Sequence, residues 1–127
     1  MIYPGTILLC NDNSGALTVK CIGIRNSSQR WGCSAGSLII VSIKTCLKGV
    51  SKVQQGSIHY AVITRTKQIV SWVSHAGDFL WFNQNSVVLV SKKNNYLPLG
   101  TRVLGPISRE VRKWTFIKLV LLSAGIF

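Results

Sequence analysis

The chain offers few side chains that could carry out acid–base or nucleophilic chemistry. Its 127 residues include two histidines, His59 and His75, and three acids, Asp12, Asp78 and Glu110. A serine–histidine–acid site could be assembled from these residues on paper, but the sequence lacks the G-x-S-x-G turn that positions a serine nucleophile. A P-loop and a dinucleotide-binding glycine motif are missing as well. We therefore expect no catalytic residue and no enzymatic activity.

The cysteine spacing gives no support to a metal site. Cys10, Cys21, Cys33 and Cys46 form no C-x-x-C pair, and no histidine lies at the spacing of a zinc site. We expect no bound metal and no cofactor, and we interpret the cysteines as reduced residues in strands. The alternative is a secreted cationic protein with two disulfides, although the first residues lack the features of a signal peptide. No apolar run approaches the roughly 20 residues of a spanning helix, which argues against a membrane partner.

Basic side chains are the abundant chemical group. Fifteen Lys and Arg residues against three acids give a formal net charge of +12, while 47% of the residues are hydrophobic. Such a chain can bury a core and is not a disordered basic tail. A core surrounded by charges of one sign indicates a polyanionic partner, for which nucleic acid is the leading candidate. A membrane surface and an acidic protein are the alternatives.

The candidate phosphate contacts lie in loops, at strand ends and on strand faces. A single exposed lysine needs no explanation beyond its contact with solvent. Ordinary protein surfaces mix charges of both signs, however, so the whole set of basic residues favours phosphate binding. The four tryptophans could stack on bases, but we expect most of them in the core or at its rim. The candidates for contact with nucleic acid are Lys20, Arg25, Arg30, Lys44, Lys48, Lys52, Arg65, Lys67, Lys92, Lys93 and Arg102.

Short strands must position these residues. Turn residues separate apolar or alternating segments, and this spacing is typical of a closed all-β barrel. We expect Leu17, Val19 and Cys21 to share one face of their strand, and Asn83–Gln84–Asn85 to close a hairpin. The expected strands are 6–10, 17–24, 38–46, 57–66, 79–82 and 87–91.

The C-terminal part follows a different pattern. Pro106 begins a short helical stretch, and Thr115 is a candidate N-cap for a second one that carries Phe116 and Leu119. We expect a single domain over residues 1–127, with the barrel in about 1–100 and the helical segment in about 105–122.

Four segments, in the same order along the chain, resemble the large-subunit ribosomal protein family uL14 (L14). The first turn reads D-N-S-G-A over 12–16, and a strand reads A-V-I-T-R-T-K over 61–67. A third segment reads F-N-Q-N-S-V-V over 82–88, and the last reads G-T-R-V-L-G-P-I-S-R-E-V-R over 100–112. Because the motifs are collinear and span nearly the whole chain, the match is specific.

The resemblance implies a small closed five-stranded β-barrel with a projecting β-ribbon and short C-terminal helices. It implies a structural constituent of the large subunit that binds large-subunit rRNA and contributes to bridges with small-subunit rRNA. The implied protein partners are a neighbour of the bL19 type and the ribosome silencing factor. Arg65, Lys67 and Arg102 lie on matched motifs and are the first candidates for rRNA. Residues near the C-terminus could serve the subunit interface or a protein neighbour, namely Arg109, Arg112 and Lys113.

Departures from the family pattern bear on localisation. Ser37 and Ser57 stand where the family commonly has Asp, and the loop 68–76 lacks its usual arginines and holds Trp72. We interpret this loss of charged residues as the mark of a mitochondrial ribosome, with a plastid or bacterial ribosome as the alternative. Asp12 is expected to be structural, and Glu110 is expected to pair with a neighbouring Arg. The alternative function is a free RNA-binding β-barrel module of a translation factor.

Overall fold

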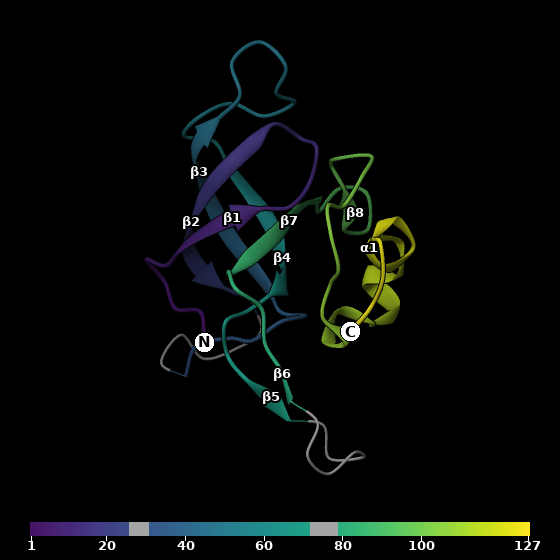
Figure 1. Cartoon of the computed structure of the whole chain (residues 1–127). Coiled ribbons are helices and arrows are strands. Elements are labelled where there is room, and N and C mark those ends of the chain that lie inside the picture. The colour runs from purple at the N-terminus through teal and green to yellow at the C-terminus, as the bar shows by residue number, and fades with distance from the viewer. Residues whose placement is uncertain (26–30, 72–78) are drawn as a thin grey trace.

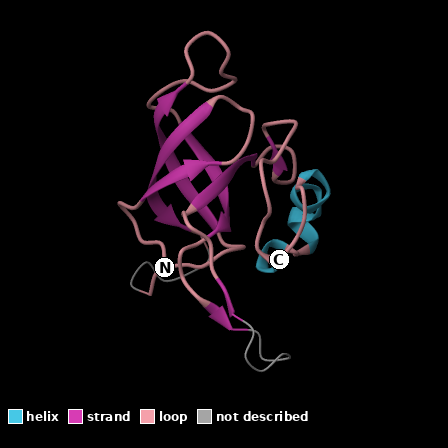
Figure 2. Cartoon of the chain, in the orientation of Figure 1, coloured by secondary structure: helices cyan, strands magenta, loops and turns pink. Residues whose placement is uncertain are grey.

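The computed structural model describes residues 1–25, 31–71 and 79–127 (Figure 1). Its centre is a barrel in which each strand pairs with the next in the order β1-β2-β3-β4-β7, and β1 pairs in parallel with β7 to close the ring (Figure 2). The predicted closed five-stranded β-barrel is therefore confirmed. The barrel strands are β1 (Ile7–Cys10), β2 (Ala16–Ile24), β3 (Leu38–Cys46), β4 (Ile58–Arg65) and β7 (Ser86–Ser91).

Alternation along the strands fills the inside of the barrel. On β3, Ile39, Val41 and Ile43 are fully buried, whereas Lys44 is exposed. This is the period-two pattern of a strand with one face in the core. On β4 the buried run Ala61–Val62–Ile63–Thr64 does not alternate, so both faces of that strand must be covered.

The second cover comes from the C-terminal segment, which lies on the right of Figure 2. It contains two 3₁₀ turns, η1 (Arg109–Val111) and η2 (Trp114–Phe116), and the helix α1 (Ile117–Leu122). Their apolar residues form a second core on the outer face of β4 and β7. The members of this second core include Val62, Val88, Val90, Ile107, Val111 and Leu119.

The predicted N-cap at Thr115 is wrong. The helix α1 begins at Ile117, its N-cap position is Phe116, and no side chain caps it. Thr115 instead lies inside the 3₁₀ turn η2, because Phe116 N–H already donates to the carbonyl of Lys113 at 2.9 Å.

The predicted hairpin between 79–82 and 87–91 is also wrong. β6 (Phe79–Leu80) pairs with β5 (Val70–Ser71) in a two-stranded ribbon that projects below the barrel in Figure 1. β7 pairs instead with β4, β1 and the short extra strand β8 (Leu97–Pro98). The hairpin that actually forms is β4–β7, and the ribbon is its extended tip.

The strand register corrects the predicted face of Leu17. Val19 and Cys21 are buried as expected, but Leu17 is exposed, because the pairing of β2 with β3 shifts between Ala16 and Thr18. A bulge of this kind turns one residue to the opposite face.

Two further observations concern the general class of the protein. All four cysteines are free, in agreement with the reduced interpretation. Among the described residues, no helix is long and apolar enough to cross a membrane.

Candidate nucleic-acid interface

The turn between β1 and β2 is built around the buried carboxylate of Asp12. Oδ1 of Asp12 accepts hydrogen bonds from Ser14 N–H at 3.2 Å and Ser14 Oγ at 2.5 Å. Oδ2 accepts from Leu89 N–H on β7 at 3.1 Å. Because its oxygens are used inside the fold, Asp12 is a structural acid, as expected, and is no partner for a catalytic histidine.

Asn13, the next residue of this turn, holds the segment that contains Arg102. Oδ1 of Asn13 accepts from the backbone N–H groups of Thr101 at 2.7 Å and Arg102 at 3.1 Å, and Nδ2 donates to Thr101 Oγ1 at 2.7 Å. A Cβ at Gly100 would lie 2.5 Å from Asn13 Oδ1, so this approach requires glycine. The two motifs therefore form one structural unit, from which the Arg102 side chain is exposed.

The same turn holds the lysine loop between β3 and β4 on its other side. Ser14 carbonyl accepts from Lys52 N–H at 2.7 Å, and Lys52 Nζ reaches the carbonyl of Leu99 at 3.5 Å. Gly15 has a positive φ of 97° and packs directly against the backbone of Ser51. Leu47 N–H donates to the Gly15 carbonyl at 2.8 Å, so the next residue, exposed Lys48, also leaves the loop beside this turn. We call Lys48, Lys52 and Arg102 the turn cluster.

A second group of cations surrounds Tyr60 on β4. The Arg25 guanidinium carbon lies 5.9 Å from the centre of the Tyr60 ring, and Lys92 Nζ lies 5.8 Å from it. Tyr60 in turn meets Tyr96 edge to face, with 6.4 Å between the ring centres. Cation–π contacts at this distance orient two exposed basic side chains toward one aromatic surface. We call Arg25 and Lys92 the Tyr60 cluster.

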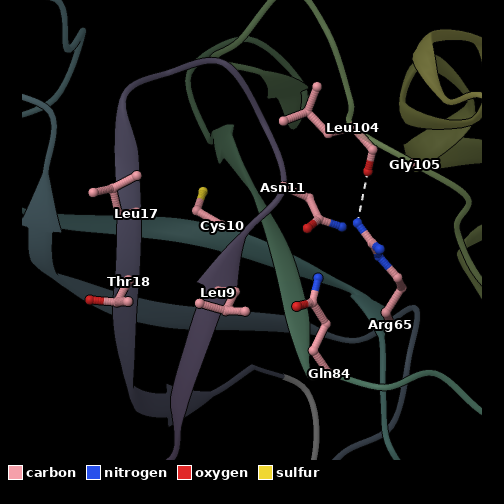
Figure 3. Close-up of a pocket in the computed structure, with 9 residues that line it drawn as sticks. All are labelled: Leu9, Cys10, Asn11, Leu17, Thr18, Arg65, Gln84, Leu104 and Gly105. Carbon is pink, nitrogen blue, oxygen red and sulfur yellow. Dashed lines mark hydrogen bonds between the residues drawn. The ribbon is translucent and has the colours of Figure 1, made fainter.

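Arg65 occupies a different environment from the other candidates. Nη2 of Arg65 donates to the Leu104 carbonyl at 2.7 Å, and its Nε is buried with no hydrogen-bond partner. Burial lowers the pKa of the Arg65 guanidinium. The side chain forms one wall of a hollow of about 450 Å³ between β1, β2 and the segment 104–105 (Figure 3). Lys67, two residues on, is exposed.

The comparison with known families decides what this arrangement is. The family described as Ribosomal protein L14p/L23e matches residues 1–127, which is the whole chain. The chain belongs to this family. It is therefore a structural constituent of the large ribosomal subunit and not an enzyme, as its sequence predicted.

Family membership gives the four collinear motifs a structural meaning. Two of them meet at Asn13 and Thr101, and Arg65 of the second motif meets Leu104 of the last. The family's partners are rRNA and other ribosomal proteins, and its location is the ribosome. These statements favour a ribosomal constituent over the alternative of a free translation-factor module.

The C-terminal cations of this L14p/L23e member differ in their surroundings. Lys113 Nζ donates to the carbonyl of Gly36 at 3.0 Å, whereas Arg112 is exposed. The charge of Lys113 acts on the Glu110 carboxyl, and the pairing of Glu110 with a neighbouring Arg stays a prediction. Burial raises the pKa of the Glu110 carboxyl, Lys113 partly opposes that rise, and Oε2 is buried without a hydrogen-bond partner.

The remaining predicted residues fall into three groups. Lys44, Lys93 and Lys20 are exposed, the last of them among aliphatic side chains. Arg30 and Trp72 lie outside the described residues. We expected most tryptophans in the core or at its rim, and Trp31 and Trp81, which are 72% and 59% exposed, are not in the core. No pattern in the sequence could have distinguished these two from core tryptophans.

The structure also accounts for the side chains that suggested chemistry. His59 Nε2 lies 3.0 Å from Ser57 Oγ, and burial lowers the pKa of His59. Ser57 Oγ also donates to the carbonyl of Gln54 at 2.5 Å, so this serine closes the end of a loop. In the part of the chain that the structure describes, no three His, Cys, Asp or Glu side chains gather as metal ligands.

Proposed function

We propose that this L14p/L23e chain binds large-subunit rRNA through its exposed cations. One observation carries the proposal: over residues 1–25, 31–71 and 79–127, every fully exposed charged side chain is basic. The acids in these ranges are Asp12, which is buried, and Glu110, which is half-buried. Phosphates are the ligands that such a surface fits best. Each lysine or arginine that contacts a phosphate releases counterions from the nucleic acid, and no fully exposed carboxylate side chain in these ranges repels the phosphate.

Within this surface, the turn cluster is the principal phosphate contact. Lys52 is anchored through its backbone to Ser14, and Arg102 through its backbone to Asn13, so both side chains project from fixed positions. Fixed cations lose less conformational freedom when they bind phosphate. Further phosphate contacts come from the Tyr60 cluster and from Lys44, Lys67 and Lys93. Exposed Trp31 and Trp81 offer surfaces on which unpaired bases stack.

The experiment compares two double variants that remove the same charge. Lys48→Gln/Lys52→Gln alters the turn cluster, and Arg112→Gln/Lys118→Gln removes two exposed cations from the C-terminal segment. Binding of the full chain to transcribed large-subunit rRNA is measured against salt concentration. The first variant should reduce the slope of log K against log salt by about one unit for each lysine.

The two variants also separate rRNA binding from subunit joining. The turn-cluster variant should incorporate poorly into large subunits on sucrose gradients, whereas the C-terminal variant should incorporate normally. An unchanged salt slope and normal incorporation of the turn-cluster variant would contradict the proposal.

We further propose that the C-terminal segment faces the other subunit and its protein neighbours. Leu121 is 76% exposed and lines an apolar groove of about 340 Å³ with Leu97, Pro98 and Lys118. This groove, and the cations Arg109, Arg112 and Lys113 earlier in the same C-terminal segment, support contacts with small-subunit rRNA and with proteins such as a bL19-type neighbour or the silencing factor. The Arg112→Gln/Lys118→Gln variant should therefore lower the yield of joined subunits.

We also propose a mitochondrial location for this ribosome. The support is the composition of the chain, in which acids are scarce and Trp, Cys and apolar residues stand where family members more often carry charge. Fractionation of the source cells, with the chain detected in mitochondrial large subunits, tests the proposal. Detection in plastid or cytoplasmic ribosomes alone would overturn it.

A further inference from the structure

The outer face of β1 and β2 carries aliphatic side chains that the barrel core does not use. Ile7 is 66% exposed and Ile22 is 47% exposed, and Leu9 and Leu17 are exposed to 40% and 45%. The inward positions of the same strands are already filled by buried residues such as Leu8 and Val19. These outer side chains therefore contribute little to the stability of the isolated chain.

Strand register places these residues side by side. Ile7 is directly opposite Lys20, and Leu9 is directly opposite Thr18. Ile22 follows Lys20 by two residues and so lies on the same face, diagonal to Ile7. We call Ile7, Leu9, Leu17, Lys20 and Ile22 the β1–β2 face. In Figure 1 the strands β1 and β2 lie apart from the ribbon β5–β6 and from the helix α1.

The hollow of Figure 3 opens at one end of this face. Leu9 and Leu17 belong to the face and also line the hollow, and Arg65 and Gln84 form part of the hollow's opposite side. Its volume of about 450 Å³ is enough to receive a side chain from another molecule. Interfaces commonly gain much of their affinity from such an anchor in a pocket.

We infer that the β1–β2 face is the docking surface for another protein of the large subunit, which presents apolar side chains and a carboxylate that pairs with Lys20. The inference rests on the place of the chain in the large subunit and not on which cations bind rRNA. Lys20 is exposed at the centre of the face, and no described residue offers it a hydrogen bond or an ion pair. An acid from the partner would supply that missing charge.

The chemistry of the face distinguishes this partner from RNA and from a second copy of the chain. RNA is bound through phosphate contacts and through bases stacked on aromatic or guanidinium groups, and aliphatic side chains offer neither interaction. A second copy carries the same net charge of +12 and would bring another Lys20 to the contact. An aliphatic surface with one central cation instead fits a protein partner that brings apolar side chains and an acid.

Zero-length cross-linking in native large subunits tests the inference directly. A carbodiimide joins a lysine amine to a carboxylate only where the two are in contact. We expect Lys20 to be linked to an Asp or Glu of another ribosomal protein, as identified by mass spectrometry of the peptides. Three outcomes would overturn the inference: a link of the Lys20 peptide to rRNA under ultraviolet light, a link to a second copy, or an unlinked Lys20 that remains open to acetylation in the subunit.

The same sample keeps this inference separate from the rRNA proposal. Lys48 and Lys52 should form ultraviolet links to rRNA and no carboxylate link. If Lys48 and Lys52 form no links to rRNA, the rRNA proposal fails. The carboxylate link of Lys20 still tests the docking surface independently.

Two variants that leave the net charge unchanged provide a second measurement. Leu9→Ser/Leu17→Ser removes apolar surface from the face, and Val50→Ser does so at a residue that is 80% exposed in the lysine loop. The first variant should lower the Lys20 cross-link yield by roughly tenfold or more, because two apolar contacts are lost. Val50→Ser should leave the yield unchanged. Equal cross-link yields in both variants would count against the docking surface. If the double variant fails to fold, the cross-linking of the wild-type chain still tests the inference.

Discussion

The guanidinium of Arg65 donates to the Leu104 carbonyl at 2.7 Å and thereby joins the end of β4 to a segment 39 residues away. In the sequence, Arg65 was a leading candidate for rRNA. In the structure, it first braces the fold, because one nitrogen is committed to Leu104 and Nε is buried. The guanidinium is thus held in place before any phosphate approaches it.

Arg65→Met should therefore destabilise the isolated chain. Methionine retains the aliphatic stem but loses the charged hydrogen bond to Leu104, which is worth about 1.5–3 kcal/mol. Urea denaturation of the full chain measures the effect. Lys67→Met is the matched control, because Lys67 is exposed and its loss should change stability by less than about 0.5 kcal/mol. Equal effects of the two substitutions would show that Arg65 is no brace.

Asn13→Ala should weaken the attachment of the Gly100–Thr101–Arg102 segment. The side chain of Asn13 makes three hydrogen bonds to Thr101 and Arg102, so we expect a loss of about 1–3 kcal/mol. Asn13→Asp is the comparison, since a carboxylate still accepts from both backbone N–H groups and can accept from the Thr101 hydroxyl in place of the lost donation. Thermal unfolding should therefore place Asn13→Asp close to the wild type and Asn13→Ala clearly below both. An Asn13→Ala chain as stable as the wild type would contradict the role of this side chain.

Gly15→Ala should be far more harmful than Gly56→Ala. Both glycines have positive φ, 97° and 82°, where alanine costs roughly 1–2 kcal/mol. At Gly15 the new Cβ would also overlap Ser51, whereas at Gly56 it would meet open space. Overpacking adds about 1–3 kcal/mol. The denaturant midpoints of the two variants measure this difference in stability. Equal midpoints would show that overlap with Ser51 does not add to the cost at Gly15.

Glu110→Gln should stabilise the chain at neutral pH but not in acid. Burial raises the folded-state pKa of Glu110 above its ordinary value of 4.5, so the folded state binds the proton more tightly than the unfolded state. Stability linked to this group is therefore highest below pH 4.5 and is lost as the pH rises through the folded pKa. Melting temperatures of wild type and variant should converge in acid and separate above it. A constant difference at every pH would contradict the burial of this carboxyl.

The sequence identified the general architecture because strand periodicity is a local property. Alternation on β3 and the dense turn at residues 11–15 reflect pleating and turn chemistry that act over a few residues. The hairpin around residues 83–85 was misplaced for the opposite reason. Which strand pairs with β7 depends on hydrogen bonds to β4 and β1, and neither segment is adjacent to it in sequence.

The candidate site shows the same division. Composition alone established a cationic surface, and the collinear motifs pointed to the L14p/L23e family that matches the whole chain. Neither could show that Lys52 and Arg102 are held by successive residues of one turn, or that Leu17 turns outward at a bulge.

By itself, then, the sequence determined the excess of basic residues, the all-β architecture and the family, since net charge, periodicity and motif order are carried by the chain without reference to contacts. Only the tertiary structure decided which cations stand together, which one braces the fold, and which apolar side chains remain outside the core. Those properties depend on strand register and barrel closure, which bring residues from distant parts of the chain within a few ångströms of one another.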